Sequence, residues 1–183
     1  MVKVLNASNK NIENYISDCL SSSGVCGSKL RETHYYLGQE VSKLIKEDCT
    51  MKNKNIALLI MMRAGLPFGL RIADVLDKNN NVEVIFSPLK EMDFSKFDYV
   101  LIADAVINTG KTIFESIEHI NNKNIIIVTN VLSGKNIDAF EKMNVYTTRI
   151  SKHSYKGSDV KVISNGKGPD TGDRLFNNHF FNK

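Results

Sequence analysis

The sequence predicts an α/β fold with a Rossmann-like parallel sheet flanked by helices. Apolar runs of strand length, such as residues 56–62 and 100–103, recur along the chain. Segments whose apolar residues recur at helical spacing alternate with these runs. The run 56–62 is apolar at every position, which is typical of a strand buried on both faces of a parallel sheet. The alternation of the two patterns therefore favours strands joined by covering helices.

The first half of the chain predicts a buried strand with a helix on either side of it in sequence. Residues 1–27 carry only a weak helical signal, which a turn rich in serine and glycine follows. Residues 29–45 predict an amphipathic helix. The apolar run 56–62 follows as the strand. Pro67 suits the first turn of the next helix, which we expect over residues 68–78.

The second half of the chain predicts four short strands, with helices between the last three. The strands are expected at residues 82–86, 100–103, 125–129 and 145–150, and the helices near residues 111–121 and 134–143. Residues 87–97 connect the first two of these strands. The polar, glycine-rich residues from Ser151 onward are expected to be irregular. Neither a repeat nor a linker divides the sequence, so we expect a single domain over residues 1–183.

Composition and charge narrow the classes of function. Of the 183 residues, 42% are hydrophobic and 24% are charged, which is ordinary for a globular protein. The net charge of +4 is spread along the chain, which favours a small anionic ligand over nucleic acid. No apolar run approaches the ~18 residues that a membrane span needs, so no membrane association is expected.

Cysteine and histidine usage argues against a metal ion held by the protein alone. The three cysteines lack C-x-x-C spacing, and the four histidines are scattered, with His34 expected on a helix surface. The sequence shows no signal peptide, and free thiols indicate a reducing compartment. We therefore expect a cytoplasmic protein.

The most informative segment runs from Tyr99 to Thr112. A buried apolar run delivers one acid, Asp104, and the turn Thr109-Gly110-Lys111-Thr112 then precedes a helical pattern. Backbone N–H groups at the start of a helix attract phosphate, and glycine lets the backbone approach oxygen closely. Asp104 could accept hydrogen bonds from sugar hydroxyls. The segment therefore predicts a site for a phosphorylated sugar at the carboxyl ends of the strands, where Arg63 also lies.

Two other interpretations of this segment stay open on the residues alone. Gly110-Lys111-Thr112 matches the end of the nucleotide-binding P-loop, G-x-x-x-x-G-K-[ST], although Ala105 stands where that motif opens with glycine. The segment could also be an ordinary strand, turn and helix without a ligand, in which Asn108 or Thr109 only caps the helix.

Three motifs resemble those of the uracil phosphoribosyltransferases, in the same order. Met62-Arg63-Ala64-Gly65-Leu66 resembles the I-L-R-A-G-L loop of that family, and the segment from Asp104 to Thr112 resembles its D-P-M-L-A-T-G-G-[ST] loop. The segment from Gly168 to Phe176 resembles its C-terminal P-G-x-G-D-x-G-D-R-x-F run, which is the most specific of the three. The resemblance extends from about residue 28 to the end of the chain.

The resemblance implies a type I phosphoribosyltransferase fold with a small C-terminal hood. It implies an enzyme that transfers phosphoribosyl from phosphoribosyl diphosphate to uracil or a related pyrimidine base, giving the nucleoside monophosphate and diphosphate. It also implies Mg²⁺ as a cofactor and a homodimer as the assembly. A non-catalytic member of the same fold, which binds phosphoribosyl diphosphate or a nucleotide, is the alternative.

The resemblance also assigns roles to residues. Asp104, Arg63 and Asp170 are the expected catalytic residues: Asp104 would hold the ribose hydroxyls, Arg63 the diphosphate, and Asp170 would lie near the diphosphate and metal. The expected substrate-binding residues are Ala64, Gly65, Asn108, Thr109, Gly110, Lys111, Thr112, Ile163, Gly168 and Asp173. Ile163 and Gly168 would contact the pyrimidine through their backbones. Asp173 could instead form an ion pair with Arg174 that shapes the loop.

Departures from the family pattern motivate the non-catalytic alternative. Family members carry a long hairpin with an arginine between the second and third core strands, whereas this chain has only residues 87–97 there. Lys90 or Lys96 could replace that arginine in part, although lysine lacks the planar fork of a guanidinium. Lys111 stands at a family glycine, and Pro169 splits the Gly-Asp pair of the C-terminal run.

Overall fold

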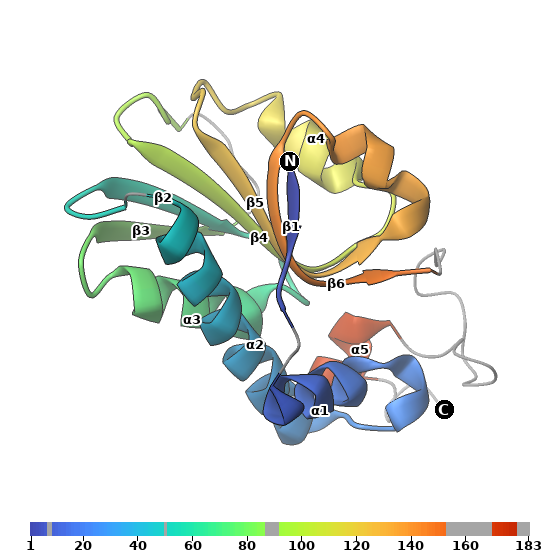
Figure 1. Ribbon diagram of the computed structural model, residues 1–183. Helices are drawn as coiled ribbons and strands as arrows, with labels where there is room; N and C mark the ends of the chain where they lie inside the picture. Colours follow the sequence, from blue (N-terminus) through green and yellow to red (C-terminus); the bar gives the residue numbers. More distant parts are fainter. Residues whose placement is uncertain (7–8, 50, 87–91, 153–169, 179–183) are drawn as a thin grey trace.

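A computed structural model describes residues 1–6, 9–49, 51–86, 92–152 and 170–178 (Figure 1). Its centre is a six-stranded sheet in the order β1-β6-β5-β4-β2-β3, and every neighbouring pair of strands is parallel. The strands are β1 (Val2–Val4), β2 (Asn55–Ile60), β3 (Asn81–Phe86), β4 (Tyr99–Ile107), β5 (Ile125–Ser133) and β6 (Asn144–Ser151). The predicted α/β fold with a parallel sheet is thus confirmed.

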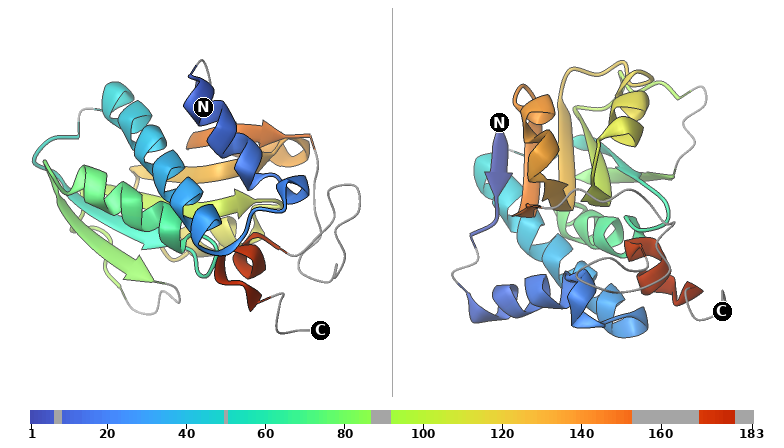
Figure 2. Two further views of the ribbon diagram at one scale, coloured as in Figure 1. Left: turned by 90° about the horizontal axis from the view of Figure 1, so that it is seen from below. Right: turned by 90° about the vertical axis from the view of Figure 1, so that its right-hand side faces the viewer.

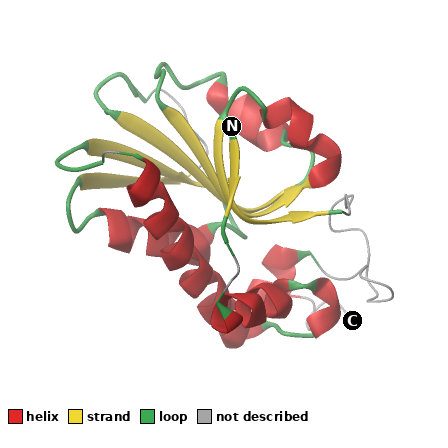
Figure 3. Ribbon diagram, viewed as in Figure 1, coloured by secondary structure: helices red, strands yellow, loops and turns green. Residues whose placement is uncertain are grey.

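Helices cover both faces of the sheet (Figure 3). They are α1 (Lys10–Cys19), α2 (Gly27–Asp48), α3 (Leu66–Leu76), α4 (Lys111–Ile117) and α5 (Thr171–Phe176), with 3₁₀ helices η1 (Ser21–Ser23) and η2 (Gly134–Phe140). The long helices α2 and α3 lie side by side on one face, and α4 and η2 lie on the other (Figures 1 and 2).

Alternation of side chains along β2 shows why a fully apolar strand suits this position. Leu58 belongs to the core on the α2 and α3 face, and its neighbour Leu59 belongs to the core on the α4 face. Both are fully buried, because successive side chains of a strand point to opposite faces and each face is covered. Burying one leucine contributes about 1.5–3 kcal/mol relative to leaving it exposed.

A third group of elements stands at one end of the sheet. We call residues 10–31 and 170–178 the hood: they comprise α1, η1, the start of α2, and α5 (Figures 1 and 2). The α5 helix packs on α2, and α1 packs on α2 as well. Two segments from opposite ends of the sequence therefore lie together here.

Several predictions of elements are wrong in detail. Strand β1 was not expected; it is short and pairs with β6, which is distant in sequence. Residues 134–140 are a 3₁₀ helix rather than part of an α-helix. Residues 171–176 form α5, whereas residues from Ser151 onward were expected to be irregular. The cap of α5 is local, since the Asp170 side chain accepts a hydrogen bond from the backbone N–H of Asp173 at 2.7 Å.

His34 is buried, and its expected position on a helix surface is wrong. Only 1% of the residue is exposed, because the hood and the sheet cover α2 from two sides. Burial, with smaller contributions from the nearby Arg174 and Arg149 cations, lowers the pKa of His34 to about 3. The imidazole is therefore neutral at physiological pH.

The close approach of α2 and α3 depends on Gly38, which leads to a first prediction. A Cβ atom at this position would lie 2.6 Å from the Phe68 carbonyl oxygen, which belongs to backbone and cannot rotate away. We expect Gly38→Ala to lower the free energy of unfolding by about 1–3 kcal/mol, despite the better helix propensity of alanine. Urea denaturation measures this, with Glu47→Ala on the exposed part of α2 as the control. Equal stabilities of the two variants would contradict the tight contact.

Candidate active site

The candidate site begins where β2 and β4 stop pairing. The last pair between them is Ile60 with Ala103, whereas β4 continues alongside β5 as far as Ile107. Asp104 is therefore the first residue of β4 without a partner on β2. The strand does not end at Ala103 as expected, because β5 still supplies its hydrogen bonds there. The acid consequently lies at a step in the carboxyl edge of the sheet.

The loop after β2 fills this step and brings Gly65 against Asp104. The Met61 backbone N–H donates to the Ala103 carbonyl oxygen at 2.9 Å. A Cβ atom on Gly65 would lie 2.5 Å from the Met61 carbonyl oxygen, 2.8 Å from that of Ala103 and 3.3 Å from the Asp104 Cα. The close packing therefore requires glycine, and Ala64 beside it packs on the core. The structure brings the first two predicted motifs together.

Burial controls the charge of Asp104. It raises the pKa of this carboxyl to about 7, and hydrogen bonds from the backbone N–H groups of Val106 and Ala105 lower it only in part. The Val106 N–H lies 3.5 Å from the Asp104 Oδ1. The carboxyl therefore exchanges its proton near neutral pH, and donors from a ligand would favour its ionised form.

The turn after β4 is built around Gly110. Its φ of +79° lies in the left-handed region, and a Cβ there would lie 2.6 Å from Phe140 and 2.7 Å from Phe114, whose rings stack. Glycine is thus required both by conformation and by space. The Asn136 side chain donates to the Asn108 carbonyl oxygen at 2.7 Å and holds the turn from η2.

The remaining residues of the turn lead into α4. The Thr109 hydroxyl accepts a hydrogen bond from the Lys111 backbone N–H at 3.3 Å, and the Thr112 carbonyl accepts one from the Ser116 hydroxyl at 2.8 Å. The Lys111 ammonium is exposed and lies 3.7 Å from a carboxylate oxygen of Glu115. The predicted phosphate-binding residues thus form one ordered turn at the carboxyl end of β4.

This geometry does not fit the P-loop interpretation. In a P-loop, the residues after the opening glycine wrap around phosphate as a loop. Here Ala105, Val106 and Ile107 belong to β4, and Val106 and Ile107 are in register with residues of β5. A strand held in a sheet cannot also encircle a phosphate.

The α5 segment closes the site from the hood. The Asp173 Oδ1 lies 3.1 Å from the Arg63 Nη2. With its side-chain amide oriented so that oxygen faces Arg63, Asn178 accepts a second hydrogen bond from that guanidinium. The ion pair shown for Asp173 is with Arg63, whereas the guanidinium of Arg174 binds carbonyl oxygens of the hood. No pattern in the sequence indicates a role for Asn178, which lies outside the three motifs.

Other predicted residues lie elsewhere. Ile163 and Gly168 fall outside the described residues, as does Lys90. Lys96 does not reach the site: its ammonium lies 3.4 Å from the Glu83 carboxylate, beside a cleft of about 550 Å³ that the strand-starting residues Asn55 and Asn81 also line. That cleft is at the amino end of β2 and β3, opposite to Asp104.

The part of the chain that the structure describes contains neither a metal-binding cluster nor a membrane-spanning helix. Among residues 1–6, 9–49, 51–86, 92–152 and 170–178, no three side chains of His, Cys, Asp or Glu gather as a metal-binding group. Within the same ranges, no helix has the length and apolar character to cross a membrane.

Comparison with known proteins shows what the chain resembles. A family model described as uracil phosphoribosyltransferase matches residues 27–178. The purine phosphoribosyltransferase from Pyrococcus horikoshii Ot3 superposes with a TM-score of 0.50 at 16% identity, covering 70% of this chain and 87% of that one. A hypoxanthine-guanine-xanthine phosphoribosyltransferase superposes with a TM-score of 0.51 at 14% identity, covering 66% and 75%. No curated protein matches the sequence. The two structures show that the fold is that of the phosphoribosyltransferases, as expected.

The raised pKa of Asp104 leads to a second prediction. The folded state binds more protons than the unfolded state between about pH 4 and 7, so the contribution of this carboxyl to stability falls as pH rises through that window. Asp104→Asn removes the effect. We expect the variant to be more stable than the parent at pH 7.5 by roughly 1 kcal/mol or more, since one pKa unit corresponds to about 1.4 kcal/mol.

Urea denaturation of both proteins between pH 4.5 and 7.5 measures this difference. It should shrink steadily as the pH is lowered. A difference that stays constant across the range would contradict the assigned pKa.

Proposed function

Because the chain belongs to the uracil phosphoribosyltransferase family, we propose that it transfers phosphoribosyl from phosphoribosyl diphosphate to uracil. The protein is a pentosyltransferase with a phosphoribosyltransferase fold. The proposal rests on the arrangement at Asp104, where the pairing of β2 with β4 ends. Here the acid, the closely packed Gly65 loop that carries Arg63, and the Gly110 turn lie along one edge of the sheet. Uracil itself is supported by the family match and by the C-terminal motif that ends in α5.

The proposed reaction is a displacement at the anomeric carbon of the ribose. A ring nitrogen of the base forms a bond to that carbon, the bond from carbon to the diphosphate oxygen breaks, and the base nitrogen loses its proton. Positive charge develops on the sugar in the transition state. The protein then acts mainly by positioning the reactants and by stabilising charge.

Asp104 has two tasks in this proposal. Its carboxylate accepts hydrogen bonds from the ribose hydroxyls, and its negative charge favours the cation that develops on the sugar. A carboxyl with a pKa of about 7 is only about half ionised at neutral pH before substrate arrives. Hydroxyl donors favour the charged form, so substrate binding itself would complete the ionisation of the group.

The phosphorylated ends of the substrate are assigned to the two glycine-containing segments. Backbone N–H groups of residues 109–112 would bind the 5-phosphate, since nitrogen donors in a turn form a concave site for anions. The loop of Arg63, Ala64 and Gly65 would bind the diphosphate. Arg63 suits this task because its guanidinium offers several donors in one plane, and Asp173 holds only part of that fork.

Mg²⁺ fits the proposal as an ion that arrives with the substrate. It keeps most of its waters and needs only one or two carboxylates in addition to phosphate oxygens. Asp170 supplies a carboxylate at the start of the α5 segment, and Asp173 of that segment reaches Arg63. When bound, the ion would neutralise charge on the departing diphosphate. Three further parts of the proposal rest on family resemblance. Ile163 and Gly168 would contact the base, the protein would form a homodimer, and it would be located in the cytoplasm.

A second candidate function is binding without catalysis. The chain has no arginine between Arg71 and Arg149, and Lys96 is engaged at the opposite edge of the sheet. A cation that family members bring to the diphosphate on their hairpin therefore has no counterpart among the described residues of that region. Such a protein would bind phosphoribosyl diphosphate and release it unchanged.

The third prediction separates these functions. With Mg²⁺ and phosphoribosyl diphosphate, a panel of bases is screened by the mass of the product, and we expect uridine monophosphate from uracil. Asp104→Asn should lower turnover by about 100-fold or more, the loss typical of removing one electrostatic stabiliser of a transition state. Asp138→Asn, a matched change at an exposed position of η2, should leave turnover unchanged.

If no base gives a product, calorimetry is used to measure whether the protein binds phosphoribosyl diphosphate. Binding without product from any base would favour the second candidate. A protein that neither binds this substrate nor forms product would exclude both functions.

A further inference from the structure

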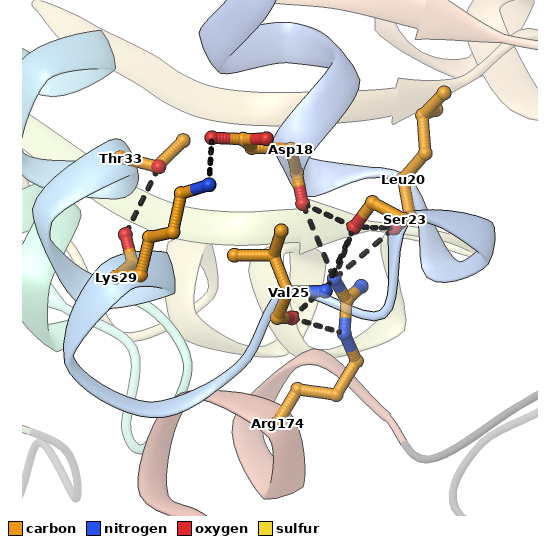
Figure 4. Close-up of polar contacts among 7 residues, drawn as sticks. All are labelled: Asp18, Leu20, Ser23, Val25, Lys29, Thr33 and Arg174. Atoms are coloured by element: carbon orange, nitrogen blue, oxygen red, sulfur yellow. Dashed lines mark hydrogen bonds and ion pairs between the residues drawn. The ribbon is translucent and has the colours of Figure 1, made fainter.

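Arg174 is an arginine of α5 whose guanidinium lies inside the hood (Figure 4). Only 3% of the residue is exposed. Its donors reach backbone carbonyl oxygens and one hydroxyl of residues 18–25, which run from the last turn of α1 to the start of α2. The acceptors are the carbonyls of Asp18 (3.3 Å), Cys19 (3.1 Å), Leu20 (3.1 Å) and Val25 (2.8 and 3.2 Å) and the hydroxyl of Ser23 (3.3 Å).

These acceptors explain how a buried cation is tolerated. The carbonyls of Asp18 and Cys19 belong to the last turn of α1, where they lack partners within the helix and carry the negative end of its dipole. The last turn of α1 has no basic residue of its own. Arg174 supplies that cation from the far end of the sequence, and the planar fork of its guanidinium matches several acceptors at once.

The residue before Arg174 points the other way. Asp173 leaves the same short helix toward the carboxyl edge of the sheet and binds Arg63 at 3.1 Å, while Asn178 binds the same guanidinium from the end of the segment. A second hood contact supports α5, since the Arg31 Nη1 donates to the Leu175 carbonyl oxygen at 2.5 Å. The α5 helix thus links the hood to Arg63.

We propose that Arg174 is a positioning residue: it fixes α5 in the hood so that Asp173 and Asn178 hold the Arg63 guanidinium at the candidate site. The helix is too short to be stable alone, so its place depends on such contacts. The consequence for substrate rests on the proposed function, in which Arg63 binds diphosphate. The anchoring of α5 itself does not.

The fourth prediction concerns this anchoring, and it is measured by hydrogen exchange of the α5 backbone amides without substrate. Arg174→Met should accelerate exchange over residues 171–176 by at least about 10-fold, and Arg174→Lys, which keeps the charge but loses the fork, by less. Arg71→Met is the matched control. It removes hydrogen bonds to Tyr35 and Gln39 on the α2 and α3 surface and should leave α5 unchanged.

A milder variant keeps the test decisive if Arg174→Met does not fold. Ser23→Ala removes one acceptor of the guanidinium, together with the hydrogen bonds of this hydroxyl to Asp18, Leu20 and Val25, but deletes no backbone carbonyl. It should accelerate α5 exchange by about 2- to 5-fold. Unchanged exchange in α5 of the folded Arg174 and Ser23 variants would overturn the anchoring.

The link to Arg63 is tested by the affinity for phosphoribosyl diphosphate. Arg174→Met and Asp173→Ala should each weaken binding by about 10-fold or more, and the double variant should be no weaker than the worse single one, because both changes act through Arg63. If the loss of affinity in the double variant equals the product of the two single losses, the proposal is overturned. If the parent does not bind this substrate, the proposed function fails, and the exchange measurement still decides whether Arg174 anchors α5.

Discussion

Strand β4 stays paired with β5 for longer than with β2, and the candidate site depends on that difference. The pairing of β2 with β4 stops at Ala103, whereas the pairing of β4 with β5 continues to Ile107. The backbone of Asp104 is therefore held on one side only. The loop that follows β2 turns into the open side, and it can approach because Gly65 has no side chain to collide with the Ala103 carbonyl oxygen. The parallel register thereby places an acid, a cationic loop and a glycine turn along one edge.

The same arrangement sets a conflict between stability and function at Asp104. Packing of the loop removes water from the carboxyl and so disfavours its charge. A neutral or amide side chain would suit the empty site better than an ionised acid does. Retaining an acid where the fold prefers none is typical of positions that serve a ligand. Arg63 does not relieve this conflict: its guanidinium pairs with Asp173 on the hood, and burial remains the largest influence on the pKa of Asp104.

Local patterns predict the strands and most of the helices, since burial on both faces of a parallel sheet leaves a continuous apolar run. The sequence also contains the three motifs whose described residues meet at the site. What they miss depends on contacts between distant residues. Strand β1 is defined by its pairing with β6, and the burial of His34 by the hood that covers α2. The sequence suggests only the adjacent acid as a partner for Arg174, because nothing in it indicates that the acceptors are carbonyls at the end of α1.

The contacts of Arg174 also bear on where the functional unit begins. The family match starts at residue 27, but every acceptor of this guanidinium precedes that residue. A chain trimmed to the matched span would lose every acceptor shown for this arginine, and water would have to replace them. The segment before residue 27 and the C-terminal motif therefore form one structural unit, which Arg174 holds together.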